Sequence, residues 1–269
     1  MKDQAEDIVR RAAAAFNAGR TDEARKLCEQ GLARSPREPM LSHLLAAMLF
    51  AQRDIATARF HIENSIQARP DNAPARLLAG RIARTAGDLT AALSHLDRAI
   101  ALKPQRDAFV EKARTLDQAG LRAPAREAWA AILKVVPDHQ EAAGRLGRLA
   151  FEDGSLTEAA SYLERATASD APASVWFDLG VVRQDLRDYP AAEIAYRRVI
   201  EIKADHAEAM LNLGIVLQEK GDPDRALEAY ASAYRLRPEM FGAIAMALTS
   251  APHGRLWLDA EELRRALGG

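Results

Sequence analysis

The sequence lacks several features that mark common classes of protein. It has a single cysteine, Cys28, among 269 residues, which excludes an internal disulfide and a multi-cysteine metal site and suits a reducing compartment. It also has almost no net charge, because 37 basic side chains face 38 acidic ones. The chain as a whole therefore has no electrostatic preference for nucleic acid or for an anionic membrane.

Long apolar stretches are also missing. No run approaches the roughly 20 apolar residues that span a bilayer. The N-terminal segment MKDQAEDIVRRAAAAF is charged and amphipathic, without the apolar core and small-residue cleavage site of a secretory signal. From these absences we expect a cytoplasmic protein that neither binds nucleic acid nor inserts into a membrane.

Residue types that carry out catalysis or hold metals occur without their usual partners. The six histidines form no HExxH or HxxxH pattern, and His139 and His206 occupy equivalent places in two similar segments. Cys28 has no paired base, so a buried hydrophobic role is favoured for it over that of a nucleophile. The sequence predicts a protein that is not an enzyme and needs no metal or cofactor.

What the sequence does have is a regular spacing of about 34 residues. Pro36, Pro70 and Pro104 are 34 residues apart, Pro137 follows after 33, and Pro238 lies 101 residues beyond. Upstream of these markers, an alanine is followed four residues later by a residue that is larger or apolar, which places the two on one helical face. The pairs are Ala24 and Cys28, Ala58 and Ile62, Ala92 and Leu96, Ala125 and Trp129, Ala159 and Leu163, Ala192 and Tyr196, and Ala226 and Tyr230.

The clearest single unit is the segment from Ala207 to Pro238, which reads as two helices and a turn. Asp222 is placed to cap the second helix, and Pro223 occupies its first position. Neither helix can bury its apolar face alone, so the unit predicts a stack of neighbours. A glycine precedes most of the alanines and predicts the turn, at Gly19, Gly87, Gly120, Gly154 and Gly221.

This pattern resembles that of the tetratricopeptide repeat, with its period of about 34 residues, its WxxLGxxY opening, a small residue, an aromatic residue and a final proline. Trp176, Leu179 and Gly180 match the opening, although Arg183 replaces the usual tyrosine. The resemblance implies an all-α fold, a right-handed superhelical α-solenoid of antiparallel helix pairs. It implies seven repeats over 5–238, at about 5–38, 39–72, 73–105, 106–139, 140–172, 173–206 and 207–238, and C-terminal capping helices over 239–269.

The resemblance also implies a binding groove, because in this family the first helix of each repeat lines a concave surface. The ninth position of three successive repeats is Arg81, Arg114 and Arg148, and Arg84 and Arg145 lie three residues from two of these on the same helical side. Guanidinium groups along a groove suit carboxylates or phosphates. The other groove candidates are the apolar Phe16, Phe50, Phe151 and Phe177 and the amide Asn212.

We therefore expect a non-catalytic scaffold or adaptor that binds a protein or peptide segment with acidic residues. The opposing interpretation is that the arginines are solvated or are neutralised by Glu111, Asp117, Asp178 and Asp185. Two other functions stay open. One is an accessory subunit of an enzyme system, such as a transferase on a separate chain. The other is homo-oligomerisation through the apolar segment from Met240 to Leu248 and through Trp257, a C-terminal region for which capping is favoured.

Overall fold

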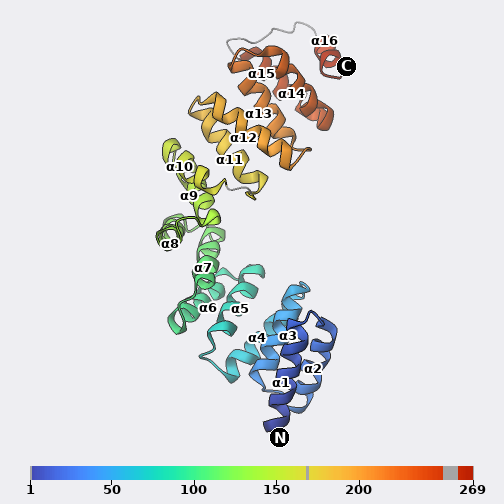
Figure 1. Cartoon of the computed structure of the whole chain (residues 1–269), viewed down its shortest axis with the longest axis vertical. Helices are drawn as coiled ribbons and strands as arrows, with labels where there is room; N and C mark the ends of the chain where they lie inside the picture. Colours follow the sequence, from blue (N-terminus) through green and yellow to red (C-terminus); the bar gives the residue numbers. More distant parts are fainter. Residues whose placement is uncertain (1, 168–169, 251–259, 269) are drawn as a thin grey trace. The chain divides into compact units, whose positions relative to one another are not determined.

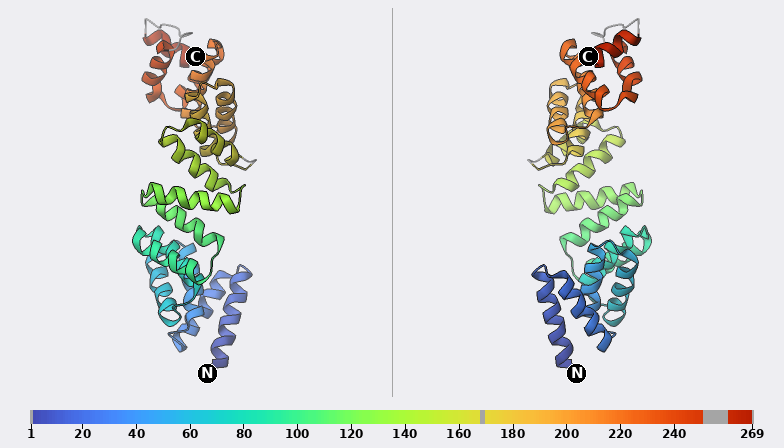
Figure 2. Two further views of the ribbon diagram at one scale, coloured as in Figure 1. Left: turned by 90° about the vertical axis from the view of Figure 1, so that its left-hand side faces the viewer. Right: turned by 90° about the vertical axis from the view of Figure 1, so that its right-hand side faces the viewer.

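The computed structural model describes residues 2–167, 170–250 and 260–268, and every element within these ranges is helical. The chain forms two compact units, Met1–Ile132 and Leu133–Gly269. In each unit, helices that follow one another in the sequence pack side by side, as Figures 1 and 2 show. Each unit is therefore a stack of helix pairs, as the period predicts.

The helices of the N-terminal unit alternate between first and second members of a pair. They are α1 (Lys2–Asn17), α2 (Thr21–Arg34), α3 (Pro39–Ala51), α4 (Ile55–Ala68), α5 (Ala73–Thr85), α6 (Leu89–Leu102) and α7 (Arg106–Gln118), and α8 (Arg122–Val135) crosses the boundary of the unit. Asp54, Asn72 and Asp88 cap α4, α5 and α6, each with a side-chain oxygen that accepts a hydrogen bond from a backbone N–H of the first turn. The caps explain why these helices begin where they do.

The C-terminal unit continues in the same way. Its helices are α9 (Gln140–Glu152), α10 (Leu156–Ala166), α11 (Ala173–Asp185), α12 (Tyr189–Ile202), α13 (Ala207–Glu219), α14 (Pro223–Leu236), the short 3-10 helix η1 (Pro238–Met240), α15 (Phe241–Ser250) and α16 (Ala260–Gly268). Each expected repeat thus contains one helix pair, while the exact limits of the repeats stay a prediction. The expected cap for α14 is present, since Asp222 Oδ1 accepts a hydrogen bond from the backbone N–H of Arg225.

The turn inside each pair requires one residue with a left-handed backbone. Five of these positions hold the glycines that the sequence singled out, with φ between 69° and 82°. The equivalent positions in α3–α4 and α11–α12 hold Arg53 and Arg187, with φ of 65° and 58°. A side chain makes this conformation costly, because Cβ approaches the following carbonyl oxygen. The turn geometry is therefore kept even where glycine is absent.

Close contact between the two helices of a pair requires a small residue on the first helix. A Cβ atom added to Gly214 would lie 2.4 Å from Cε1 of Tyr230, and one added to Gly180 would lie 2.6 Å from Cε1 of Tyr196. Both tyrosines are fully buried, so their rings have no room to move aside. The glycine and the aromatic side chain therefore act together to set the distance between the helices.

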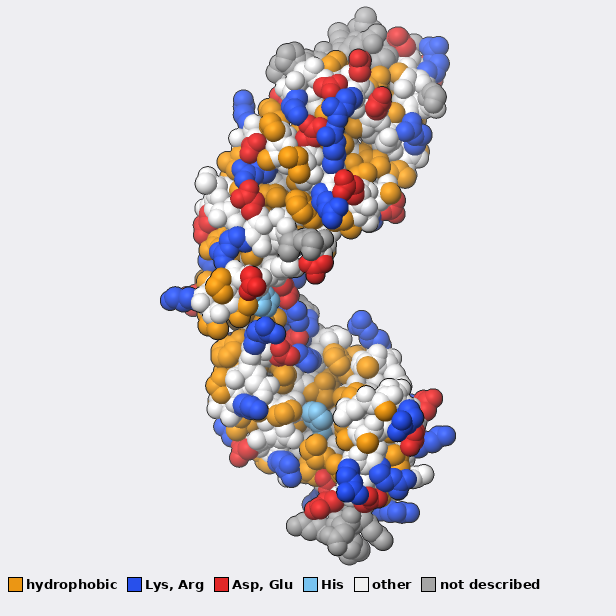
Figure 3. Space-filling model, in the orientation of Figure 1, with side chains coloured by type: hydrophobic (Ala, Val, Ile, Leu, Met, Phe, Trp, Pro, Cys, Tyr) orange, Lys and Arg blue, Asp and Glu red, His pale blue; other side chains and the backbone are white. Residues whose placement is uncertain are grey.

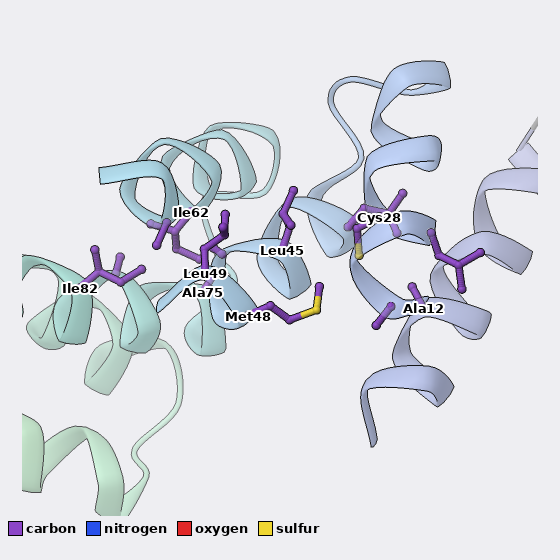
Figure 4. Close-up of a cluster of buried hydrophobic side chains, with 14 of the residues drawn as sticks. Ala12, Cys28, Leu45, Met48, Leu49, Ile62, Ala75 and Ile82 are labelled. Atoms are coloured by element: carbon purple, nitrogen blue, oxygen red, sulfur yellow. The ribbon is translucent and has the colours of Figure 1, made fainter. Parts of the chain in front are cut away.

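The N-terminal core is built from small and aliphatic side chains, and Figure 4 shows part of it. Cys28 is completely buried there, near Ala12 and Leu45. Burial, with a smaller contribution from the nearby carboxylate of Glu29, raises the pKa of the Cys28 thiol to about 11. The thiol is therefore protonated at neutral pH and inert, in agreement with the expected role of Cys28 as a small hydrophobic residue.

The last two helices cover the end of the stack. α16 packs on α14 through Leu263 and Leu267, and α15 contributes the buried Ile244 and Leu248. The buried Gln218 on α13 donates hydrogen bonds to the carbonyl oxygens of Ala247 and Leu248, which α15 cannot satisfy itself. The two helices expected in this C-terminal segment are present and pack on the last regular pair, while their role as a cap stays a prediction. Trp257 lies outside the residues that the structure describes.

Replacing Arg53 or Arg187 by glycine is expected to stabilise the protein by about 1 kcal/mol, because the left-handed conformation then costs little. The free energy of unfolding from urea titration measures the effect. The reverse change, Gly154→Arg, should destabilise by a similar amount, and Arg53→Lys should change little. Destabilisation by both glycine variants would contradict the prediction.

Candidate functional site

Three of the arginines that the sequence singled out meet at one carboxylate in the N-terminal unit. Arg81 and Arg84 lie one turn apart on α5, while Glu111 and Arg114 lie one turn apart on α7. Because α5 and α7 are first helices of neighbouring pairs, they lie close enough for side chains to bridge them. The period of the sequence thus brings together residues that are about 30 positions apart.

Glu111 is the centre of this arginine cluster. Its side chain is only 5% exposed, and its carboxylate lies 3.2 Å from Arg81 Nε, 3.1 Å from Arg84 Nη2 and 2.9 Å from Arg114 Nη1. A buried carboxylate is costly unless it is paired and hydrogen-bonded, and these guanidinium groups supply the pairing. Glu111 in turn holds the arginines in place, with Arg81 and Arg84 still 34% and 26% exposed.

The cluster supports part of each interpretation of the arginines. Glu111 does pair with them, as the opposing interpretation expects, but three guanidinium groups share this one buried carboxylate. A second carboxylate, that of Asp107, lies 3.5 Å from Arg81 and is mostly exposed, so its interaction is weakened by solvent. Three guanidinium groups thus converge on one buried carboxylate, and Asp107 adds an exposed one beside Arg81.

The remaining arginines lie in the C-terminal unit, on α9. Arg148 Nη2 lies 2.5 Å from Asp178 Oδ2 on α11, so this pair bridges two neighbouring first helices. Arg145 and Arg148 both line a cavity of about 370 Å³ between these helices. Phe151, at the end of α9, is half-buried and packs against a separate core cluster that includes Leu163 and Leu179.

Phe177 and Asn212 take part in packing between helices. The ring of Phe177 stacks on that of His206, with centroids 5.0 Å apart and an angle of 23° between the planes. Asn212 donates a hydrogen bond of 3.3 Å to the hydroxyl of Tyr196, which donates one of 2.9 Å to Gln184. Both predicted groove residues are half-buried and connect α13 to the preceding pair.

Sequence reasoning missed a hydrogen bond that recurs inside the helix pairs. The side chain of an aromatic residue on the second helix donates to a polar side chain twelve residues earlier, on the first. The pairs are Trp129 with Asp117 at 2.8 Å, Tyr196 with Gln184 at 2.9 Å, and Tyr230 with Gln218 at 3.0 Å. The signal was present, because a polar residue precedes each of these aromatics at the same spacing.

A second buried carboxylate was also missed, in the C-terminal unit. Glu193 on α12 is 7% exposed and pairs with Arg197 at 2.5 Å, with Arg225 at 3.4 Å, and with Lys220. Arg197 lies one turn away on α12, while Lys220 and Arg225 flank the turn between α13 and α14. Glu193 therefore ties the seventh pair of helices to the sixth.

Three histidines in the N-terminal unit are shifted toward the neutral form. Burial lowers the pKa of His43, His61 and His95, and the positive charge of Arg76 contributes at His95. His43 Nδ1 is buried without a hydrogen-bond partner among the described residues. Within the same residues, no three histidine, cysteine, aspartate or glutamate side chains lie close enough together to hold a metal ion.

Charged and hydrophobic side chains are interspersed over the face shown in Figure 3, in keeping with the balanced composition. Among the described helices, none is both long and apolar enough to cross a membrane.

Stacked antiparallel helix pairs with a period of about 34 residues define a repeat protein of the α-solenoid class. Three sequence models, each described as tetratricopeptide repeat, match the chain at residues 49–110, 110–174 and 171–239. The chain belongs to the tetratricopeptide repeat family. Proteins of this family are generally non-catalytic scaffolds for interactions with other proteins or peptides.

Similar proteins are found at low identity. A segment of 63 residues is 33% identical to tetratricopeptide repeat protein 8 of Caenorhabditis elegans. The matched segment is 23% of this chain but only 12% of that protein. The structure of MamA is 24% identical, with a TM-score of 0.54 over 60% of this chain and 95% of MamA. That of the APC/C hetero-tetramer Cut9–Hcn1 is 17% identical, with a TM-score of 0.61 over 95% of this chain and 48% of that one. The structural similarities establish the fold.

Replacing Glu111 by glutamine is expected to destabilise the N-terminal unit by about 2 kcal/mol, because the guanidinium groups then repel one another without a central carboxylate. Asp107→Asn is the matched control. It removes an exposed carboxylate that pairs with Arg81 and should cost less than about 0.5 kcal/mol. Urea titration of both variants measures the difference, and equal effects would show that Glu111 is not the centre of the cluster.

Stability is expected to fall on acidification from pH 7 to pH 5. The unfolded chain takes up protons on its histidines near their ordinary pKa of about 6.5, whereas buried His43 in the folded chain stays neutral to a lower pH. The stabilisation is therefore complete above pH 6.5 and declines below it. In thermal unfolding scans, His43→Leu should make the decline of stability with falling pH shallower. The decline that remains is due to His61 and His95, whose pKa values burial also lowers. An unchanged pH profile would contradict this assignment.

Proposed function

We propose that the protein is a cytoplasmic, non-catalytic scaffold that binds a segment of another protein across the first helices of its repeats. An acidic side chain of the partner meets the arginine cluster on α5 and α7. The observation that carries this proposal is the convergence of Arg81, Arg84 and Arg114 on the buried Glu111, with Arg81 and Arg84 partly exposed.

Preorganisation makes this cluster a better receptor than isolated surface arginines. A free arginine loses side-chain freedom when it binds an anion, and that loss reduces affinity. Here the ion pairs with Glu111 already restrict Arg81 and Arg84, and Gln118 on α7 is within 3.4 Å of Arg84 Nη1. A carboxylate that approaches the exposed side of these guanidinium groups therefore meets donors with a set geometry.

The helical framework supports the same proposal. Stacked pairs supply a rigid surface that needs little ordering on the receptor side. The Cut9–Hcn1 structure, a hetero-tetramer, shows the same fold within a protein assembly. Association of this chain with an enzyme on a separate chain would be one form of such scaffolding. Met246 on α15 is 70% exposed, which leaves self-association through the last helices as a second candidate.

The proposal is tested with randomised displayed peptides selected on the full chain. Acidic residues should be enriched, and Arg81→Gln with Arg84→Gln should weaken binding of a selected peptide at least about tenfold in calorimetry, since hydrogen bonds to charged groups are lost. Arg59→Gln with Arg98→Gln is the control, because it removes equal charge from the second helices α4 and α6.

A further double variant tests whether any loss of binding is caused by loss of structure. Arg81→Lys with Arg84→Lys keeps the charge near Glu111 but removes the planar fork, so it should fold and bind with intermediate affinity. Circular dichroism verifies that each variant is helical. Unchanged binding by the folded glutamine variant, or equal losses in variant and control, would overturn the assignment of the cluster.

A further inference from the structure

The cavity between α9 and α11 contains a helical glycine that packing does not explain. Gly144 lines this cavity of about 370 Å³ together with Ala166 and Val175. A Cβ atom added to Gly144 would lie 3.7 Å from Ala166 Cβ and 3.7 Å from Val175 Cγ2, which is ordinary van der Waals contact. Alanine would therefore fit without any displacement.

Other glycines of the first helices differ in this respect. On the same helix, a Cβ atom added to Gly147 would lie 2.6 Å from Leu163 Cγ, so that glycine is required by packing. Gly180 and Gly214 are required in the same way by tyrosine rings. A glycine inside a helix is less favourable than alanine because it orders a more flexible backbone. At Gly144, none of the neighbouring atoms requires the glycine, and the position lines the cavity.

The lining of the cavity indicates what it can hold. The charged side chains around it are two arginines, Arg145 and Arg148, and two carboxylates, Glu141 and Asp178, so their charges balance. Arg148 pairs with Asp178 across this rim, so a neutral peptide suits the rim better than an acidic side chain does. The apolar part of the lining, at Gly144, Ala166 and Val175, suits an apolar side chain.

We propose that this cavity receives an aromatic side chain of the bound protein segment and that Gly144 determines how deeply the ring enters. An aromatic ring is favoured over an aliphatic chain because guanidinium groups at the rim stack on aromatic faces. It also provides a large contact area with little loss of conformational freedom. The inference rests on the proposal that the first helices bind a protein segment, and it concerns a place and a chemistry distinct from those of the arginine cluster.

The test uses two substitutions at Gly144 in the full chain. Gly144→Leu fills the cavity, and Gly144→Ala adds only a methyl group. Gly144→Ala should raise the Tm by about 2 °C, because it removes the cost of a helical glycine. Gly147→Ala is the matched control on the same helix, and it should lower the Tm because its methyl group collides with Leu163.

Binding is measured with the displayed peptides selected on the unmodified chain. These peptides should be enriched in phenylalanine, tyrosine or tryptophan, and Gly144→Leu should weaken their binding at least about tenfold, the loss expected for an aromatic anchor. Replacing the aromatic residue of a peptide by alanine should produce a similar loss on the unmodified chain and none on the Gly144→Leu variant.

The outcomes separate this inference from the proposed function. Selected peptides that lose affinity with the Arg81 and Arg84 variants but bind the Gly144→Leu variant normally would overturn the inference and leave the proposed function in place. Enrichment of aliphatic or acidic residues at the Gly144-sensitive position would overturn the aromatic assignment. Failure to select any peptide would overturn both proposals, and a drop in Tm for Gly144→Ala would show that packing requires the glycine.

Discussion

The contact between the two helices of each pair is the constraint on which the rest of the structure depends. A small residue on the first helix faces a large buried side chain on the second, as Gly214 faces Tyr230 and Gly147 faces Leu163. Because the large side chain fills the space left by the missing Cβ, the two helices approach closely. Each pair then has a set geometry, so the next pair can pack on it and repeat the arrangement.

Charged groups add a second level of organisation in each unit. Glu111 in the N-terminal unit and Glu193 in the C-terminal unit are both buried carboxylates that pair with cationic side chains from neighbouring helix pairs. Such groups are costly to bury and are stable only when their partners are correctly placed. They therefore favour one relative position of adjacent pairs, which close packing of apolar side chains alone specifies less sharply.

The proposed binding features of the two units have different chemistries. In the N-terminal unit, guanidinium groups are gathered at one carboxylate and suit an acidic side chain. In the C-terminal unit, balanced charges surround a cavity with an apolar lining that suits a ring. One repeat architecture thus carries distinct surfaces, because substitutions on the exposed side of the first helices leave the contact inside each pair unchanged.

The sequence by itself determined the helix pairs, the five turns marked by glycine and the family, because these depend on local spacing. Proline and glycine end helices, and an alanine and a larger residue four positions apart share one face. It also named Arg81, Arg84 and Arg114, and it placed Glu111 among four carboxylates that could neutralise them. It did not show that all three arginines share Glu111, nor that Tyr230 donates a hydrogen bond to Gln218. Only the tertiary structure decided these features. Burial and ion pairing depend on which side chains the neighbouring pairs bring together, and the helical period alone does not specify this.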